Sequence, residues 1–359
     1  MSEEGGKARA ALVTGGAGFI GVNLADRLAR AGRRVLVYDS LRRPGVERNL
    51  EWLCRTHGEK IECCIEDVGN GGALARAVAR AGQVFHCAGQ VAVTTSVEQP
   101  AADFEVNARG TLNLLEAVRA CPEPPPLLFT STNKVYGRLA GLDFEEGALR
   151  YAPRDPEVRR RGIDESRPLD FYSPYGCSKG AADQYVLDYA RIYGLPTVVF
   201  RMSCIYGPHQ HGTEDQGWVA HFLIRSLQGR PITICGNGKQ VRDILYVDDL
   251  LDAFLLAMEH MDAIRGRAFN IGGGPENAIS LREFLESIRE VHGHAPAITH
   301  GSWRPGDQLY YVSDTGAFER ATGWRRRVGK EEGISRLHAY LAAQNEMTSA
   351  FREPAAAAV

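Results

Sequence analysis

A tyrosine and a lysine, four positions apart, are the first residues whose types and spacing suggest chemistry. The segment SPYGCSK places Tyr175 and Lys179 at positions i and i+4. Ser173 is a typical N-cap and Pro174 suits the first helical position, so the segment predicts the start of a helix. On one helix face the ammonium would favour the ionised phenol and lower its pKa from about 10. Such a phenolate is a general base for a hydroxyl group.

The same spacing arises by chance in many helices, and the alternative is a surface tyrosine beside a lysine. The composition of the chain argues against that alternative. Of the 42 Lys and Arg residues only 6 are Lys and 36 are Arg, a bias typical of a GC-rich genome. Because lysine and arginine are not interchangeable, a lysine retained under this bias favours a specific role, and Lys179 is one of the six.

A glycine-rich turn near the N-terminus is the second candidate site. Residues 11–21 read ALVTGGAGFIG, an apolar strand followed by glycines at 15, 18 and 21 and by a helical pattern from Val22. A dinucleotide pyrophosphate needs backbone N–H groups at close range and a helix N-terminus directed at it, and glycine removes the Cβ that would block this approach. A glycine triplet alone is weak evidence, because turns are rich in glycine.

Asp39 strengthens the dinucleotide interpretation. It ends the next predicted strand, RRVLVYD, 18 residues after Gly21. A carboxylate there can accept hydrogen bonds from both adenosine ribose hydroxyls and would repel a 2′-phosphate, which favours NAD. Arg42 and Arg43 follow closely and could accommodate such a phosphate, so NADP remains an alternative.

A hydroxyl at a strand end would complete this chemistry. Residues 127–137 read LLFTSTNKVYG, and Thr132 lies just past the predicted strand, where it could hydrogen-bond the reacting oxygen. The alternative is a turn threonine that satisfies local backbone groups.

Alternating strands and helices must position these residues. Short apolar runs predict strands at 10–14, 34–38, 61–65, 84–87, 127–131, 196–201 and 269–271, and helical periodicity covers 22–31, 72–81, 105–120, 281–292 and 333–343. This alternation predicts an α/β fold with a Rossmann doubly wound parallel sheet, joined by a smaller mixed α/β substrate-binding domain at the C-terminal side.

The predicted domain boundaries follow from the same pattern. The dinucleotide-binding domain covers 8–205 and about 241–272, the substrate-binding domain covers about 206–240 and 273–345, and 346–359 form a tail. We interpret the charged stretch 138–169 as an irregular insertion or lid, and its three arginines at 159–161 as a solvated surface.

Charge and hydropathy exclude several kinds of partner. The formal net charge of −2 offers no global field for nucleic acid or an anionic membrane. No run approaches the roughly 18 apolar residues that span a bilayer, and the first apolar run is too short for a signal-peptide core. The 8 cysteines form no Cys-x-x-Cys pair, which favours reduced thiols in a cytoplasmic protein. His209 and His211 lack the further ligands of a metal site, so we expect no metal.

The ordered motifs together resemble the extended short-chain dehydrogenase/reductase family from about residue 10 to 340. The motifs are TGGAGFIG, Asp39, FHCAGQ (85–90), NARGTLNLLEA (107–117), STNKVYG, YGCSK and GNGKQVRDILYVDD (236–249). The resemblance implies NAD as cofactor, with Tyr175, Lys179 and Thr132 as the catalytic set. It also implies a homodimer that pairs through two helices, here 105–120 and 179–193. The residues that it implies for NAD binding are Gly15, Gly18, Phe19, Ile20, Gly21, Asp39, Ser40, Asp67, Val68, Ala88, Gly89, Gln90, Asn107, Thr130, Tyr175 and Lys179.

The two residues that follow the catalytic threonine narrow the range of possible reactions within that family. Sugar-nucleotide 4,6-dehydratases carry an Asp-Glu pair there, as acid and base for the elimination of water. In this chain the positions are Asn133 and Lys134. An amide cannot act as that acid and an ammonium reverses the charge, so dehydration is disfavoured.

Three segments resemble the CDP-paratose 2-epimerase branch of the family, also called the CDP-tyvelose epimerases. They are GQVAVTTSVEQP (89–100), TSTNKVYG and RMSCIYGPHQHGTEDQGWVAHF (201–222), in which EDQGWV is the most specific part. The resemblance implies an isomerase that inverts C2 of a CDP- or UDP-linked hexose through a transient 2-keto sugar, with Tyr175 as general base and no net redox. The alternatives are a UDP-sugar 4-epimerase with the same catalytic set and, less favoured, a catalytically silent NAD-sensing protein.

The residues that the resemblance implies for substrate binding surround the catalytic set. They are Gln90, Thr132, Asn133, Lys134, Cys204, Gln216, Gly217, Arg242, Arg304 and Gln308. Arg242 and Arg304 match positions that hold a nucleotide diphosphate, and the bidentate guanidinium suits that task. Cys204 stands where many relatives have an Asn, so contacts there must differ.

Overall fold

The computed structural model describes residues 9–304 and 306–350, with side chains up to residue 346. Its centre is a seven-stranded sheet in the order β12-β8-β5-β4-β1-β2-β3, in which every neighbouring pair is parallel. The strands are β1 Ala10–Thr14, β2 Val35–Asp39, β3 Ile61–Ile65, β4 Ala81–His86, β5 Leu127–Thr132, β8 Thr197–Met202 and β12 Arg267–Ile271. Each strand begins within three residues of the start of a predicted strand and ends within two residues of its end. The predicted parallel sheet is therefore confirmed.

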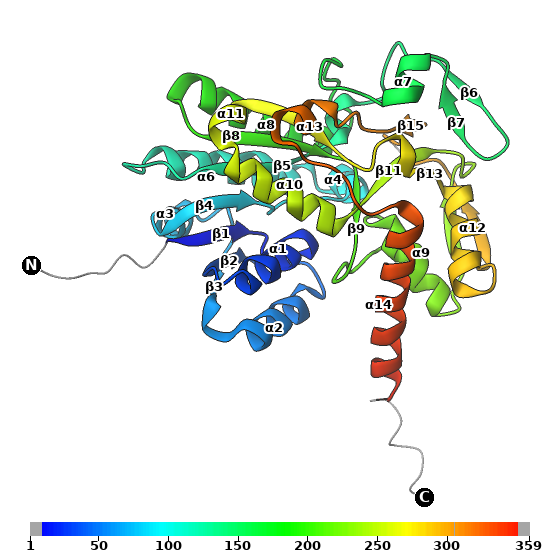
Figure 1. Ribbon diagram of the computed structural model, residues 1–359, viewed down its shortest axis with the longest axis horizontal. Coiled ribbons are helices and arrows are strands. Elements are labelled where there is room, and N and C mark those ends of the chain that lie inside the picture. Colours follow the sequence, from blue (N-terminus) through cyan, green and yellow to red (C-terminus); the bar gives the residue numbers. More distant parts are fainter. Residues whose placement is uncertain (1–8, 305, 351–359) are drawn as a thin grey trace, which may run out of the picture.

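Helices cover both faces of this sheet, because alternate side chains of each buried strand need an apolar neighbour on either side. One core contains Val13 of β1 with α1 Phe19–Arg30, α2 Val46–His57 and α10 Val247–Glu259. The other contains Leu12 of β1 with α3 Gly71–Val78, α6 Gly110–Arg119 and α8 Pro174–Tyr193. Figure 1 shows the strands running from β8 near the top to β3 near the bottom. The predicted doubly wound α/β fold is therefore confirmed.

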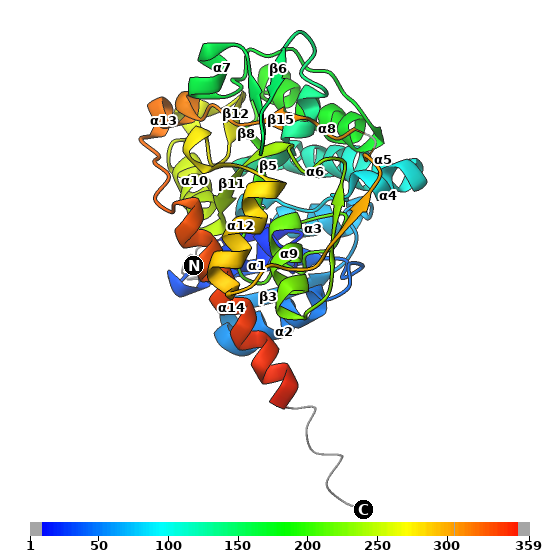
Figure 2. The ribbon, with the colours of Figure 1, turned by 90° about the vertical axis from the view of Figure 1, so that its right-hand side faces the viewer.

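A smaller lobe is built from the carboxyl half of the chain. Its strands form two sheets, β10 Ile232–Cys235 with β14 Ile298–Gly301, and β11 Val241–Tyr246 with β9 Cys204–Tyr206, β13 Ala278–Ser280 and β15 Tyr310–Tyr311. Its helices are α9 Trp218–Leu227, α12 Leu281–His292 and α14 Lys330–Ala350. Phe222, Phe284 and Ile334 from these three helices share one core. Figure 2 shows the three helices in front.

The remaining elements are short. They are α4 Val93–Glu98, α5 Pro100–Phe104, α7 Pro156–Arg161, α11 Met261–Ile264, α13 Gly316–Thr322, the 3-10 turns η1 Gly58–Lys60, η3 Asn133–Tyr136 and η4 Pro275–Asn277, the π-helical turn η2 Glu105–Arg109, and the strands β6 Phe144–Glu146 and β7 Tyr151–Pro153.

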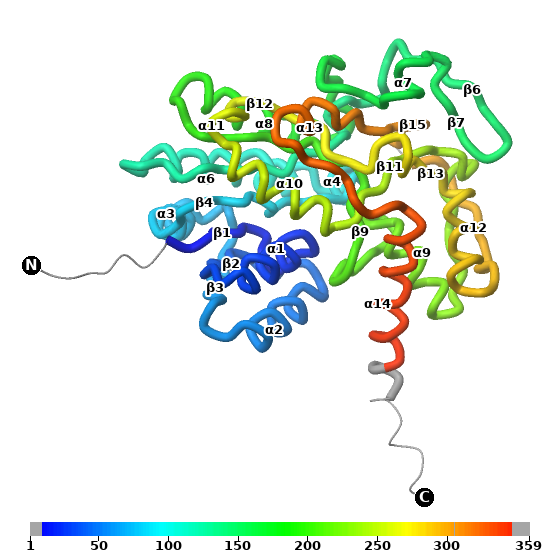
Figure 3. The backbone as a smooth tube through the Cα atoms, viewed as in Figure 1, coloured from blue at the N-terminus to red at the C-terminus, as the bar shows by residue number. Residues whose placement is uncertain are grey.

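The structure differs from the predicted domain pattern in two places. Phe318 of α13 and Trp324 pack in the core of the large sheet, although the sequence assigned 273–345 to the smaller domain. Figure 3 follows this return, with the orange chain at α13 lying near β12. Helix α14 also continues to Ala350, beyond the predicted start of the tail at 346. Residues 351–359 lie outside the described part of the chain.

The charged stretch 138–169 is more regular than predicted. β6 and β7 pair as an antiparallel hairpin, and the Asp155 side chain caps α7, whose first residue is Pro156. The sequence pattern did not predict these elements, because short hairpins and single-turn helices need few apolar residues and the stretch is rich in charged ones. The arginines at 159–161 are largely exposed and each pairs with a carboxylate, so the predicted polar surface is confirmed.

Other sequence expectations concern thiols, membranes and metals. All eight cysteines are free thiols. Within the described part of the chain, no helix is long and apolar enough to cross a bilayer. The same residues contain no group of three or more His, Cys, Asp or Glu side chains suited to a metal ion.

Candidate active site

The proposed catalytic residues meet where β5 ends and α8 begins. Thr132 is the last residue of β5, while Tyr175 and Lys179 lie in the first turns of α8. The Ser173 side chain accepts the Gly176 N–H at 3.2 Å and Pro174 is the first helical residue, so the predicted helix start is confirmed. Tyr175 and Lys179 are 7% and 4% exposed, which excludes a surface pair.

The electrostatics of Tyr175 differ from the prediction. Burial raises the pKa of the phenol to about 12, while a hydrogen bond with Thr132 opposes this shift. Lys179 Nζ instead donates to the Thr130 carbonyl at 2.6 Å and lies 4.2 Å from the Phe129 ring centroid. Burial lowers the pKa of Lys179 to about 8. The prediction of a lowered phenol pKa is wrong for this arrangement, because the loss of water around the phenol outweighs its hydrogen bond with Thr132.

Three glycines shape the turn between β1 and α1 in different ways. Gly15 has a φ of +68°, and a Cβ on it would lie 2.6 Å from the Ala88 nitrogen. A Cβ on Gly21 would lie 2.2 Å from the Gly15 oxygen, so these two glycines are needed for the protein's own packing. Gly18 is more open, since its Cβ would meet only the Gly15 oxygen, at 3.1 Å. It is the N-cap of α1, and no side chain caps that helix. The free helix N-terminus fits a pyrophosphate.

Asp39 lies beside this glycine turn. Its carboxylate accepts the Ala17 N–H at 3.0 Å and the Leu41 N–H at 2.9 Å, which fixes its orientation at the end of β2. Arg42 pairs with Asp67 at 3.1 Å. Arg43 donates to the Gln216 side chain and to the His211 carbonyl. Asp39 at the end of β2 would repel a 2′-phosphate and Arg43 is already used within the protein, so this loop favours NAD.

The other residues expected to bind NAD lie at the same edge of the sheet, because the carboxyl ends of parallel strands meet there. They follow successive strands: Ser40 follows β2, Asp67 and Val68 follow β3, Ala88, Gly89 and Gln90 follow β4, and Thr130 lies on β5. These residues, the open Gly18 and the uncapped N-terminus of α1 together fit a dinucleotide.

Asn107 has a positioning role in this edge. It lies in the π-helical turn η2, is 1% exposed, and accepts the Gln90 N–H at 3.0 Å while donating to the Gln90 carbonyl at 3.1 Å. Its amide also donates to Asp103 and Ser178. The side chain is therefore used within the protein, and it holds the Gly89–Gln90 loop beside the active site.

A cavity of about 250 Å³, here called the catalytic cavity, is lined by Thr132 and Tyr175, but not by Lys179, and by several of the residues expected to bind substrate. Its lining includes Phe19, Ile20, Thr132, Asn133, Lys134, Tyr175, Cys204, Asp215, Gln216, Gly217 and Trp218. The expected residues Gln90, Arg242, Arg304 and Gln308 do not line it. Gln308 is 2% exposed and donates to the Gly137 carbonyl at 2.6 Å, while Asn133 donates to Gln308 at 3.4 Å. Gln308 therefore supports Asn133 from behind.

A buried charge cluster lies next to this cavity. Arg242 donates to Asp307 at 2.6 Å, and Lys134 Nζ lies 3.8 Å from the same carboxylate. Burial lowers the pKa of Lys134 to about 8, with a further contribution from Arg242. Burial disfavours the charged form of Asp307, but Arg242 and Lys134 hold its pKa below the usual range. Two cations share one carboxylate, which leaves net positive charge for an anionic ligand. Asp307 stands in the same WRPGDQ motif as Arg304, but its sequence position predicted no role for it.

The two loop histidines pack against aromatic and amide side chains. The His209 ring lies 4.1 Å, centroid to centroid, from Trp52, and its Nδ1 is 3.3 Å from the Tyr340 hydroxyl. His211 Nε2 lies 3.2 Å from Asn49 Oδ1. Both rings connect the smaller lobe to α2.

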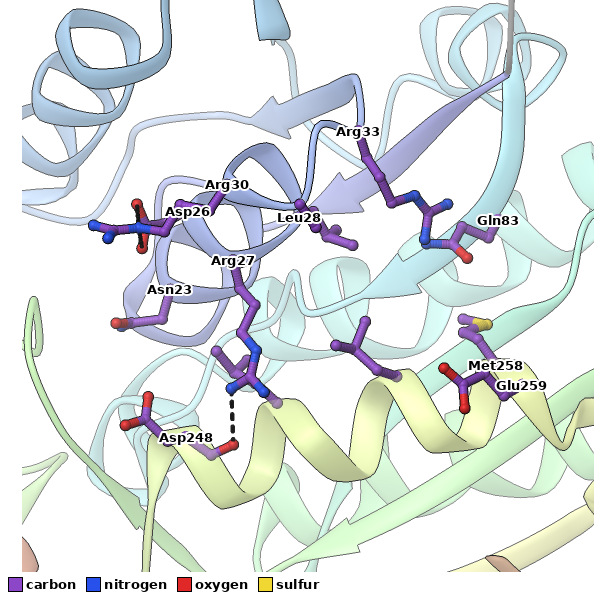
Figure 4. A pocket seen from close by; sticks show the side chains of 13 residues that line it. Asn23, Asp26, Arg27, Leu28, Arg30, Arg33, Gln83, Asp248, Met258 and Glu259 are labelled. Atoms are coloured by element: carbon purple, nitrogen blue, oxygen red, sulfur yellow. Dashed lines mark hydrogen bonds and ion pairs between the residues drawn. The ribbon is translucent and has the colours of Figure 1, made fainter.

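A larger hollow of about 750 Å³ lies between α1 and α10 and shares no lining residue with the catalytic cavity (Figure 4). Leu28 and Met258 are among its apolar residues. Figure 4 shows Arg27 reaching toward α10, where it donates to the Asp248 carbonyl at 3.5 Å. None of the three proposed catalytic residues lines this hollow, so we assign it no part in the reaction.

Comparison with known proteins gives consistent results. The family described as NAD dependent epimerase/dehydratase matches residues 11–272. The chain is 42% identical over 334 residues to a CDP-paratose 2-epimerase of Salmonella typhi, covering 91% of this chain and 97% of that protein. It is 30% identical over 326 residues to a putative UDP-glucose 4-epimerase of Methanocaldococcus jannaschii, covering 91% and 96%. The solved UDP-glucose 4-epimerase of Thermus thermophilus, in complex with NAD, matches with a TM-score of 0.77 and 33% identity over 92% of this chain and 98% of that one.

Proposed function

We propose that this chain, which belongs to the NAD-dependent epimerase/dehydratase family, inverts C2 of a CDP-linked hexose or deoxyhexose. It is a nucleotide-sugar epimerase, that is, an isomerase that uses NAD. The observation that carries the proposal is the 42% identity to a CDP-paratose 2-epimerase over 91% of this chain, against 30% for a 4-epimerase over the same share. Asn133 and Lys134 line the catalytic cavity where a dehydratase needs an acid and a base, which supports epimerisation.

In the proposed reaction Tyr175 takes the proton of the C2 hydroxyl and returns it at the end. Thr132 is hydrogen-bonded to Tyr175, and in the proposed reaction its hydroxyl also hydrogen-bonds the C2 oxygen of the sugar. The glycine turn would hold NAD, which would supply the acceptor and later the donor of the C2 hydride, and whose oxidised ring would supply a positive charge. The hydrogen bond with Thr132 opposes the burial that raises the pKa of Tyr175 to about 12, and a positive charge near the phenol would act in the same direction.

Inversion at one carbon requires that the 2-keto sugar turns while the nucleotide stays bound. We assign the nucleotide diphosphate to Arg242 and Arg304 and the sugar to the catalytic cavity. Lys134 lies between these two regions, since it lines the cavity and contacts the Asp307 carboxylate of the charge cluster. A diphosphate near this cluster would gain from its net positive charge.

Large exposed apolar side chains support a homodimer. Phe104 of α5 is 49% exposed, and Tyr185, Ile192 and Tyr193 of α8 are 47%, 61% and 50% exposed. These residues lie on or next to the helices expected to pair, and a second copy would remove them from water. Sedimentation equilibrium should give twice the chain mass of 39.3 kDa, and a monomer at micromolar concentration would contradict the pairing.

We also propose the cytoplasm as the compartment, which suits eight free thiols.

The experiment that tests the reaction is incubation with CDP-, UDP-, dTDP- and GDP-sugars followed by NMR of the products. We expect inversion at C2 of a CDP-sugar, with deuterium placed at C2 retained at C2. Loss of that deuterium to solvent would refute hydride transfer within the site. Inversion at C4 of a UDP-sugar would support the second candidate, a 4-epimerase, which the 33% identity to the Thermus thermophilus enzyme favours.

A further inference from the structure

A short acidic turn lies at the mouth of the catalytic cavity. Thr213 and Gln216 pair through two backbone hydrogen bonds, of 2.9 and 3.3 Å, and this pair encloses Glu214 and Asp215. The side chains of Glu214 and Asp215 are 52% and 48% exposed. Asp215 and Gln216 also line the cavity, so the turn, residues 213–216, borders both the solvent and the proposed sugar site.

Two arginines from different parts of the molecule hold the acidic turn. Arg304, after β14 in the smaller lobe, lies 3.4 Å from Glu214 and 3.8 Å from Asp215. Arg43, after β2 in the dinucleotide-binding half, donates to the Gln216 side chain and lies 3.4 Å from the His211 carbonyl. The turn therefore bridges the two lobes, with one anchor on each.

The two anchors differ in strength of attachment. Arg43 is partly buried, and this burial lowers its pKa. Its contacts are with an amide and a carbonyl, which a phosphate would not displace by charge exchange. The contacts of Arg304 are with two half-exposed carboxylates, and pairs of this kind are weak and exchangeable.

A diphosphate and a pair of carboxylates present the same chemistry to a guanidinium, because both offer anionic oxygens to its N–H fork. Resting on the proposed function, which assigns Arg304 to the nucleotide diphosphate, we propose that Glu214 and Asp215 act as an exchangeable clasp on Arg304. The diphosphate takes Arg304 from the two carboxylates, while Arg43 remains the positioning residue that keeps Gln216 at the cavity.

This exchange makes the acidic turn a determinant of nucleotide affinity. Each nucleotide that binds must replace the carboxylates on Arg304, and each that leaves is replaced by them. The clasp thus weakens binding of substrate and product alike and favours product release, without touching the reacting carbon. Arg304 stays paired throughout the cycle, since one anion replaces the other.

The test is the affinity for CDP, measured by isothermal titration calorimetry on the NAD-loaded protein. In the Glu214→Gln/Asp215→Asn variant we expect the Kd of CDP to fall about fivefold at low salt, from the loss of two weak ion pairs. The matched control is Glu286→Gln/Glu332→Gln, which removes two exposed, arginine-paired carboxylates elsewhere and changes net charge equally. We expect its Kd to stay within about twofold of the parent value.

A second background separates the clasp from a general charge effect. In Arg304→Gln the affinity for CDP should fall, and adding Glu214→Gln/Asp215→Asn should then change it no further. Equal Kd values for the parent and the Glu214→Gln/Asp215→Asn variant would overturn the clasp while leaving the proposed function intact. Failure of the parent protein to bind any of CDP, UDP, dTDP and GDP would overturn the proposed function, and the clasp with it.

Discussion

Replacing Asp183 by asparagine should destabilise the protein strongly, because that carboxylate neutralises a buried arginine. Asp183 lies on α8, one turn after Lys179, and is fully buried. Both of its oxygens accept hydrogen bonds from Arg201, each at 2.9 Å, and Ser131 donates to it at 2.8 Å. Burial opposes the charge of Arg201, but these two hydrogen bonds hold its pKa above the usual range.

The magnitude follows from what the substitution leaves behind. Asp183→Asn leaves the Arg201 guanidinium buried at 5% exposure without a counter-charge, and breaking a buried pair in this way costs about 3–5 kcal/mol. That is a large share of the roughly 5–15 kcal/mol by which domains are stable. The pair also joins α8 to β5 and β8, so we expect turnover to fall because Tyr175 and Thr132 are carried on α8 and β5.

The assay is equilibrium denaturation in urea, followed by tryptophan fluorescence, with epimerase activity measured on the same samples. The matched control is Asp188→Asn, on the same helix, where an exposed carboxylate pairs with Arg191. We expect that control to change the free energy of unfolding by less than about 0.5 kcal/mol. A loss below about 1 kcal/mol in Asp183→Asn, or a loss equal to that of the control, would refute the reasoning.

Three further predictions concern the active site. Tyr175→Phe should lower turnover about 10²- to 10⁴-fold while NAD and CDP still bind, as product NMR and calorimetry would show; unchanged turnover would exclude Tyr175 as the base. Because the pKa of Lys179 is lowered to about 8, its ammonium is present below that pH and lost above it, so the rate should fall above about pH 8. That alkaline limb should persist in Lys134→Met and move to higher pH in Lys179→Arg; the opposite pattern in the pH profiles would assign it to Lys134, whose pKa is also about 8. Gly18→Ala should fold but retain little NAD after purification, whereas Gly21→Ala should unfold at a lower temperature, since its Cβ would lie 2.2 Å from a backbone oxygen; equal melting temperatures would contradict the packing argument.

Local signals predicted much of the fold correctly. The bounds of β1, β3 and α12 match the predicted ranges, and α8 begins where Ser173 and Pro174 predict. Strands buried on both faces are continuous apolar runs, and caps act on the residues next to them, so both can be recognised without knowledge of distant contacts. Local patterns predicted neither α9 nor α10, which pack against strands and helices distant in sequence.

The candidate active site was likewise predicted only in part. Sequence identified the residue types, because Tyr, Lys, Thr, the glycines and Asp39 stand in motifs whose spacing is set by one helix or one turn. It could not predict that burial raises the pKa of Tyr175 to about 12, since burial is a property of the whole packed core. Nor could it place Asn107 and Gln308 behind the residues that they support.

The sequence by itself determined the family and the doubly wound sheet and predicted a catalytic set, because each depends on contiguous motifs and on short-range periodicity. Only the tertiary structure decided how charges are shared between distant segments. It placed Asp307 between Lys134 and Arg242, and the acidic turn between Arg43 and Arg304. These pairings join residues up to 173 positions apart, as with Arg43 and Gln216. An ion pair depends on distance and burial in three dimensions, which no spacing along the chain records.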